Sequence, residues 1–156
     1  MNLTFPTTPA RLYAMFQDET YLQMKCAHSE NGNFTVARTS DLTEVEVNRS
    51  FSDIPESFKK FVGSTLDISE SQHWRDEGAD KFGATVELVV RDKPVQIVGT
   101  FKLAPHLNGS ILEIDAQVEV KIPLFGAMAE GVIKAHIQEL LDDERAIALQ
   151  WIENQS

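Results

Sequence analysis

Several polar side chains occupy positions at which their segments otherwise place apolar ones. Some lie in segments whose apolar residues alternate, and the others lie on the apolar stripe of a helical segment. The set is Arg38, Arg49, Glu70, Gln72, His136 and Glu144. A buried charge without a partner is strongly destabilising, so we expect these groups either to pair or to serve a site. They are expected to converge on one interior.

Three interpretations of this set remain open. In the first, Arg49 pairs with Glu70 and His136 donates to a carbonyl, so that the groups are structural. In the second, they are the few polar contacts that orient a ligand in an otherwise apolar pocket. In the third, His136 and Glu144 act as acid and base, although their separation along one helix would require a bridging group.

Metal and thiol chemistry are poorly supported by the residue pattern. The histidines show no ligand-like pairing, and they are His28, His73, His106 and His136. The single Cys26 cannot form an internal disulfide, and its neighbours give at best a weak indication of a reactive thiol. The acidic run from Asp142 to Glu144 resembles a metal site only in composition, and its first residue at least is typical of a solvated helix face. We expect no metal and no cofactor.

Length, composition and charge limit the classes of protein to which this chain can belong. A chain of 156 residues with 42% hydrophobic content predicts a single domain over residues 1–156. The net charge of -10, from 24 acidic and 14 basic residues, argues against nucleic acid as a partner. The N-terminal segment does not resemble a signal peptide, and no long apolar run indicates stable membrane insertion. The expected location is therefore cytoplasmic.

The elements that must position these groups follow from periodicity. Thr8 as N-cap and Pro9 at the first helical position predict a short helix, and a second short helix follows it. The residues Asn31-Gly32-Asn33 predict a turn. Alternating strands are expected at 34–40, 44–51, 65–74, 81–90, 94–103 and 109–122, with a short helix beginning near Pro55.

Short connections between the later strands favour an antiparallel meander. They contain Glu77-Gly78, Arg91-Asp92-Lys93 and Asn108-Gly109. One face of this sheet is apolar and must be covered.

The C-terminal segment supplies the cover. Pro123 should end the last strand, and Gly126 should let the chain turn into a helix that continues to about Glu153. Its predicted apolar face consists of Phe125, Ala129, Val132, Ile133, Ile137, Leu140, Ile147 and Trp151. We expect this helix to pack on the sheet through Val132, Ile133, Leu140 and Trp151.

The segment from Val120 to Ile152, with its Pro-Leu-aromatic-Gly turn and early Glu130, resembles the corresponding junction in bacterial members of the START-like superfamily. The resemblance covers nearly the whole chain, and within that superfamily it is closest to a bacterial family of unknown function. It implies an α+β helix-grip fold, in which a curved antiparallel sheet of about six to seven strands wraps around the long C-terminal helix. Two short helices would follow the first strand.

In many such relatives the cavity between sheet and helix binds a lipid, sterol, polyketide or hormone. The resemblance therefore implies binding of a small hydrophobic or amphipathic ligand. Small residues at inward positions, Ala84, Gly99, Ala116 and Ala129, favour such a cavity. The predicted ligand site consists of Arg49, Glu70, Trp74, Phe101, Val118, Val132, Ile133 and His136.

No residue pattern matches the catalytic groups of a cyclase or hydrolase, so no catalytic residue is predicted. An enzyme of the cyclase or hydrolase type and a ligand-free interaction domain remain the alternatives. The sequence leaves the ligand and the oligomeric state open.

Overall fold

The computed structural model describes residues 1–27, 29–52, 54, 56, 59–60, 63–121 and 126–155, without the side chain of His136. Its strands are β1 (Asn2–Phe5), β2 (Asn31–Arg38), β3 (Thr43–Phe51), β4 (Leu66–Gly78), β5 (Lys81–Val90), β6 (Val95–His106) and β7 (Gly109–Val120). They form one antiparallel sheet in the order β1-β7-β6-β5-β4-β3-β2. The helices are α1 (Pro9–Phe16), α2 (Glu19–Cys26) and α4 (Gly126–Asn154).

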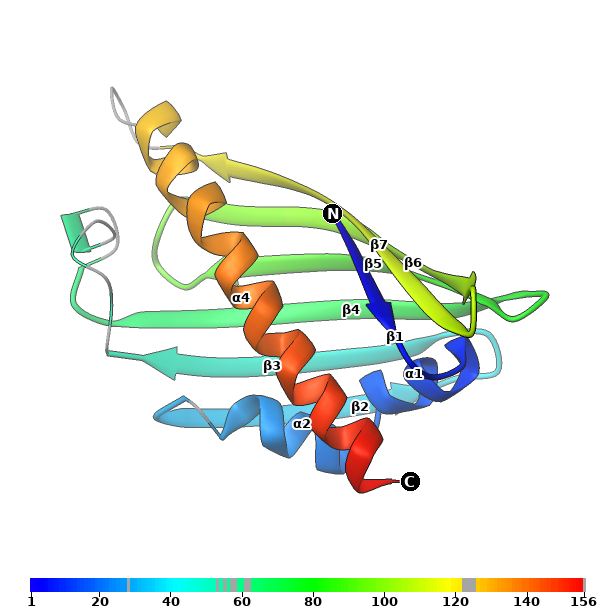
Figure 1. Ribbon diagram of the computed structural model, residues 1–156. Helices are drawn as coiled ribbons and strands as arrows, with labels where there is room; N and C mark the ends of the chain where they lie inside the picture. Colours follow the sequence, from blue (N-terminus) through cyan, green and yellow to red (C-terminus); the bar gives the residue numbers. More distant parts are fainter. Residues whose placement is uncertain are drawn as a thin grey trace.

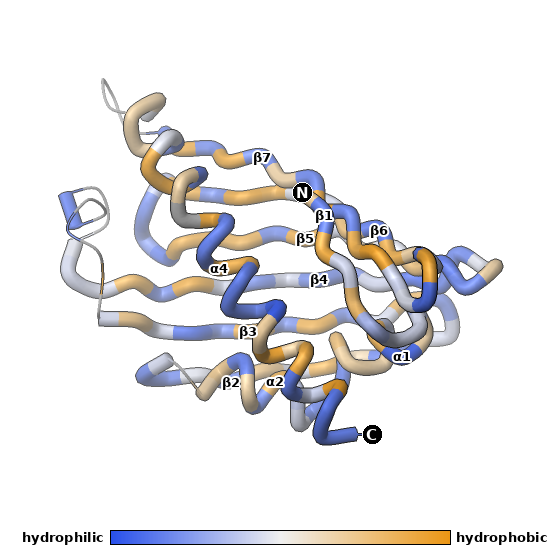
Figure 2. The backbone as a smooth tube through the Cα atoms, viewed as in Figure 1, coloured by the Kyte–Doolittle hydropathy of each residue, from blue (hydrophilic) through white to orange (hydrophobic). Residues whose placement is uncertain are grey.

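The sheet forms because apolar and polar residues alternate along its strands, which Figure 2 shows as alternating colours. In β7, for example, Leu112, Ile114 and Val118 are buried on the inner face, whereas Glu113 and Asp115 are exposed on the outer face. Every strand from β2 to β7 pairs with its neighbour in the chain, as the predicted meander requires. The predicted fold class, an α+β helix-grip architecture, is confirmed.

The turn between β4 and β5 lies two residues later than the predicted Glu77-Gly78. β4 continues through Gly78 with an irregular register after Asp76, and the turn to β5 consists of Ala79 and Asp80. Both turn residues have positive φ, 53° and 59°, as a tight two-residue hairpin turn demands. The predicted strand ends too early, at Trp74, because the last residues of β4 include no apolar side chain that would continue the alternation.

The predicted turn at Asn31-Gly32-Asn33 is wrong, because these residues begin β2. Gly32 lets the end of α2 approach the backbone of β2 closely. A Cβ atom at this position would lie 2.6 Å from Cβ of Cys26, at the end of α2. The short helix predicted near Pro55 lies largely outside the described residues, and so do Pro123 and Phe125.

The two short helices after β1 are confirmed, and each begins at a capping side chain. Oγ1 of Thr8 accepts a hydrogen bond from the backbone N–H of Arg11, and Pro9 is the first residue of α1. Oδ1 of Asp18 accepts from the backbone N–H of Tyr21 and also from the indole N–H of Trp151, at 3.1 Å. The cap of α2 therefore also anchors the last turns of α4.

Helix α4 lies diagonally across the inner face of the sheet, from the end of β7 to the vicinity of α1 and α2 (Figure 1). Its predicted bounds are confirmed to within one residue. Ile133 and Trp151 are buried as expected, and Val132 is half-buried. The prediction for Leu140 is wrong, because this side chain is 57% exposed.

The core explains the exposure of Leu140, because it is divided into two clusters. The larger one joins β1, α1, α2, the middle of the sheet and the last turns of α4 through Ala148, Trp151 and Ile152. The smaller one joins the ends of β6 and β7 to the first turns of α4 through Ala129 and Ile133. Leu140 lies between the two along α4 and belongs to neither.

No helix in the described ranges, the 29-residue α4 included, has the length and apolar character that a membrane span requires.

Candidate functional site

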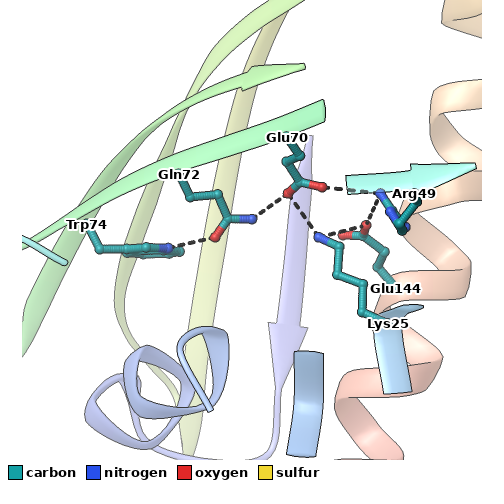
Figure 3. A network of polar contacts seen from close by, with 6 residues as sticks. All are labelled: Lys25, Arg49, Glu70, Gln72, Trp74 and Glu144. Carbon is teal, nitrogen blue, oxygen red and sulfur yellow. Dashed lines mark hydrogen bonds and ion pairs between the residues drawn. The ribbon is translucent and has the colours of Figure 1, made fainter. Parts of the chain in front are cut away.

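Four charged side chains from four elements meet on the inner face of the sheet (Figure 3). Nζ of Lys25, on α2, lies 2.9 Å from Oε1 of Glu70 on β4 and 3.2 Å from Oε1 of Glu144 on α4. Nη2 of Arg49, on β3, lies 3.2 Å from the other oxygen of Glu70 and 3.9 Å from Glu144. Two positive and two negative groups thus form a neutral network.

The network is buried to different depths. The side chains of Lys25 and Glu70 are 2% and 4% exposed, whereas those of Arg49 and Glu144 are 14% and 28% exposed. Its outer side, toward Arg49 and Glu144, therefore reaches solvent while its inner side is dry. Nε of Arg49 is buried without a hydrogen-bond partner among the described residues. A buried donor of this kind is costly unless something outside the described atoms satisfies it.

Hydrogen bonds through Gln72 and Trp74 extend the network into the core. Glu70 accepts a hydrogen bond from the side-chain amide of Gln72, and Oε1 of Gln72 accepts from the indole N–H of Trp74 at 2.8 Å. The alternation of β4 places all three side chains on the inner face. Trp74 itself is fully buried and stacks on Phe16, with ring centroids 4.9 Å apart.

The electrostatics keep both central groups charged. Burial alone would lower the pKa of Lys25, but the carboxylates of Glu144 and Glu70 raise it above its ordinary value. Burial alone would raise the pKa of Glu70, but Lys25 and Arg49 lower it. A proton-transfer group needs a pKa near the working pH, so neither residue is suited to acid/base chemistry at neutral pH.

Burial also raises the pKa of the Cys26 thiol, which disfavours the reactive thiolate. Among the described residues, no group of three or more histidine, cysteine or acidic side chains is placed to hold a metal ion.

The pairing of Arg49 with Glu70 predicted from strand phase is confirmed. Glu144 joins them, as its position on the apolar stripe of α4 suggested. Arg38 does not: it is exposed, and it donates to the side chain and the carbonyl of Gln17 at 2.8 and 3.1 Å. It lies in the last position of the edge strand β2 and reaches the C-cap of α1 instead. The side chain of His136 is not described.

Lys25 is the site residue that the sequence-based reasoning missed. A signal was present, because Lys25 follows Tyr21 by four residues and Leu22 by three on a helix, and both of these are buried. The low apolar content of α2 obscured this pattern.

The apolar residues of the predicted ligand site fall into separate groups. Trp74 and Phe101 belong to the larger core cluster, with ring centroids 5.9 Å apart. Val118 and Ile133 belong to the smaller one. Val132 is half-buried on α4.

Between these groups the inner face of the sheet carries two small residues. Gly99 and Ala116 lie opposite each other on β6 and β7 and are half-buried. Glycine at 99 is also required by the sheet itself, since a Cβ there would lie 2.4 Å from the carbonyl oxygen of Asp115.

A small cavity lies between the C-terminal half of α4 and the strands β1, β6 and β7. It has a volume of about 20 Å³, room for about one water molecule. Its lining includes Phe16, Tyr21, Phe101, Ile114, Glu144 and Ala148. Glu144 therefore faces both the charged network and this cavity.

Comparison with known proteins identifies a family and a fold. A family described as "Protein of unknown function (DUF2505)" matches residues 1–152. No curated protein matches the sequence. The crystal structure of TTHA0849 from Thermus thermophilus has a TM-score of 0.67 at 16% identity and covers 100% of this chain and 97% of its own. That of CV1439 from Chromobacterium violaceum has a TM-score of 0.51 at 18% identity, covering 96% and 94%. At such identities these likenesses establish the fold alone.

Proposed function

The chain belongs to the DUF2505 family of proteins of unknown function, and we propose that it binds a small hydrophobic or amphipathic ligand between α4 and the inner face of the sheet. The ligand would be lipid-like or polyketide-like. The resemblance of the segment from Val120 to Ile152 to the START-like superfamily supports this class of ligand.

The observation that carries the proposal is the division of the core beneath α4. On a helix of 100° per residue, Leu140 lies within about 20° of both Ile133 and Trp151. Those two residues are buried at 9% and 6% exposure, yet Leu140 between them is 57% exposed. The middle of the helix thus presents an apolar side chain toward a place where the core is absent. An apolar ligand would complete the core there.

Half-buried apolar residues on the facing strands support the same position. Leu88 and Phe101 lie at the margin of the larger cluster, and Ile97 lies at the margin of the smaller one. All point to the inner face, and all retain accessible surface. Their apolar surface would be removed from water by a ligand, at about 25 cal/mol per Å².

The charged network supplies a polar end to this apolar space. Arg49 and Glu144 form its solvent-reaching side, and Nε of Arg49 has no hydrogen-bond partner in the described part of the chain. In an amphipathic ligand, the polar end would lie toward these groups and the apolar part would lie beneath Leu140. The cavity of about 20 Å³ is too small for such a molecule, so binding requires the middle of α4 to move away from the sheet.

The proposal is tested by placing a larger side chain on the inner face of β7. Titration of a fluorescent fatty acid should show binding at micromolar concentration in the wild type. Ala116→Phe points into the gap and should weaken binding about tenfold or more. Gln117→Phe adds the same side chain on the exposed outer face of β7 and is the matched control, so its affinity should be unchanged.

Native mass spectrometry of protein purified from its own cells should find a retained small molecule. The proposal is wrong if the wild type binds no apolar probe and retains no molecule. It is also wrong if Ala116→Phe and Gln117→Phe, both folded by circular dichroism, bind the probe equally well.

A further inference from the structure

Glu144 is a carboxylate that the described part of the protein leaves without a hydrogen-bond donor. It forms ion pairs with Lys25 and Arg49, at 3.2 and 3.9 Å, but it accepts no hydrogen bond from any described residue (Figure 3). Glu70, the other carboxylate of the network, accepts hydrogen bonds from Lys25, Arg49 and Gln72. The Glu144 side chain is also the more accessible of the two, at 28% exposure against 4%. An incoming donor would therefore find its acceptor in Glu144.

Tyr21 offers a donor on the same cavity. Tyr21 and Glu144 both line the cavity of about 20 Å³. Tyr21 is buried, at 2% exposure, and its hydroxyl group forms no hydrogen bond with the part of the chain that the structure describes. Burial raises the pKa of Tyr21, so the hydroxyl keeps its proton at neutral pH and can donate it in a hydrogen bond.

The rest of the cavity lining is apolar apart from Arg145. Nε and Nη2 of Arg145 donate to the backbone carbonyl of Thr4, at 3.2 and 3.0 Å, so this guanidinium is already engaged. Phe101 connects the cavity with the space beneath Leu140, because it lines the cavity and lies two residues from Gly99 on the inner face of β6. The cavity is thus a small polar end to the apolar space.

We propose that the ligand is an uncharged amphipath whose polar end is a hydroxyl group, and that this group binds in the cavity between Tyr21 and Glu144. The inference rests on the proposed function, since the apolar part of the ligand would lie beneath Leu140. The hydroxyl oxygen accepts a hydrogen bond from Tyr21, while its O–H donates to Glu144. The size also fits, because the cavity has room for about one water molecule and a hydroxyl group is similar in size.

A carboxylate is the wrong polar end for this site. It has two oxygens and no proton to donate, so it would leave Glu144 without a donor. It would also place a second negative charge beside Glu144, and like charges at close range disfavour each other. The network has no surplus positive charge to compensate, because Lys25 and Arg49 are matched by Glu70 and Glu144. The site should therefore select alcohols and phenols over fatty acids.

Probes that share one pyrene-labelled alkyl chain test this selectivity by fluorescence titration at neutral pH. They are a primary alcohol, its methyl ether and the fatty acid of the same chain length. The wild type should bind the alcohol about tenfold or more tightly than the acid. The ether keeps the acceptor oxygen but has no O–H to donate to Glu144, so it should also bind more weakly than the alcohol. Because the apolar chain is the same in each probe, the differences report on the polar end.

Two substitutions with matched controls assign the preference to the named groups. Glu144→Gln removes the negative charge and should reduce the preference for the alcohol over the acid about fivefold or more. Asp143→Asn removes the same charge from an exposed neighbouring position of α4 and should keep the wild-type preference. Tyr21→Phe removes only a hydroxyl group and should weaken alcohol binding about fivefold. Tyr13→Phe makes the same change on α1, outside the cavity lining, and should leave alcohol binding unchanged.

The outcomes separate this inference from the proposed function. A wild type that binds none of the probes would overturn the proposed function and the hydroxyl site with it. A wild type that binds the acid or the ether as tightly as the alcohol would overturn the hydroxyl site alone. So would an unchanged preference in Glu144→Gln, or equal alcohol binding by Tyr21→Phe and Tyr13→Phe. Circular dichroism checks the folding of each variant, and the tyrosine pair tests the site independently should Glu144→Gln not fold.

Discussion

At the scale of residues, Lys25 and Arg49 approach the two oxygens of one buried carboxylate from different elements. Removing two such charges from water is costly, and the cost is repaid only if each remaining lone pair finds a donor. Glu70 meets this condition through Lys25, Arg49 and Gln72. The network therefore specifies how α2, β3 and β4 meet.

A double-mutant cycle measures this coupling. Glu70→Gln leaves Lys25 and Arg49 without their common partner and should destabilise the protein by about 3 to 5 kcal/mol. Combined with Arg49→Met, the two effects should be non-additive by about 0.5 to 3 kcal/mol in urea unfolding. As a control, Glu56→Gln removes the exposed pair with Lys59, at 2.9 Å, and should change stability by less than about 1 kcal/mol. Additive effects would contradict the pairing.

The pH dependence of the Glu70→Gln difference follows from the lowered pKa of Glu70. A carboxyl whose pKa is lower in the folded state stabilises that state above its unfolded pKa, near 4.5, and loses this contribution as pH falls through the folded pKa. The difference in unfolding free energy between wild type and Glu70→Gln should thus be constant from neutral pH to about 5 and shrink below about 4.5. Urea unfolding at several pH values measures it. A difference that grows on acidification would exclude the lowered pKa.

At the scale of elements, α4 is fastened at its two ends. Its first turns pack on β6 and β7 through Ala129 and Ile133, and its last turns pack on α1 and α2 through Trp151 and Ile152. Between these ends, Glu144 ties the helix to Lys25 and Arg49. Leu140, between these attachments, is a large apolar residue that remains 57% exposed although it shares the face of Ile133 and Trp151.

Two alanine substitutions on the same helix face distinguish the attached parts from the middle. Ile133→Ala creates a cavity in the smaller cluster and should cost about 2 to 5 kcal/mol. Leu140→Ala removes a side chain that is 57% exposed and should change stability by no more than about 0.5 kcal/mol. Urea unfolding of both variants measures the contrast. An equal cost for the two would mean that α4 packs uniformly along its length.

At the scale of the whole molecule, surface charge opposes compactness. The chain carries a net charge of -10, whereas the buried network is neutral. Salt screens exposed charges over about 8 Å at 0.15 M but has little effect on buried pairs.

The melting temperature should therefore rise between low salt and about 0.2 M sodium chloride. A rise of about 2 to 4 °C corresponds to about 1 kcal/mol for a chain of this size. Glu70→Gln should show the same salt dependence as the wild type, because the group that it alters is buried. Thermal melts monitored by circular dichroism measure both. A fall in melting temperature with salt would mean that exposed attractive pairs outweigh the net repulsion.

Local periodicity in the sequence determined the order and type of α1, α2, α4 and the strands from β2 to β7, apart from the start of β2, whereas β1 was expected only from the resemblance. Alternation identified β7 and its inner face, and the stripe from Ala129 to Trp151 identified α4 within one residue. The partnership of Arg49 and Glu70 also followed, since both lay in phase with apolar neighbours on adjacent strands. These inferences needed only the geometry of a strand or a helix.

Only the tertiary structure decided which parts of each face meet a partner. Leu140 has the same helical phase as Ile133, yet it is exposed because the core divides beneath it. Asn31-Gly32-Asn33 has the composition of a turn but forms a strand, because these residues pair with residues 48–50 of β3. Lys25 became a central group because α2 meets β4 there. Burial depends on contacts between segments far apart in the chain, and local periodicity contains no record of those contacts.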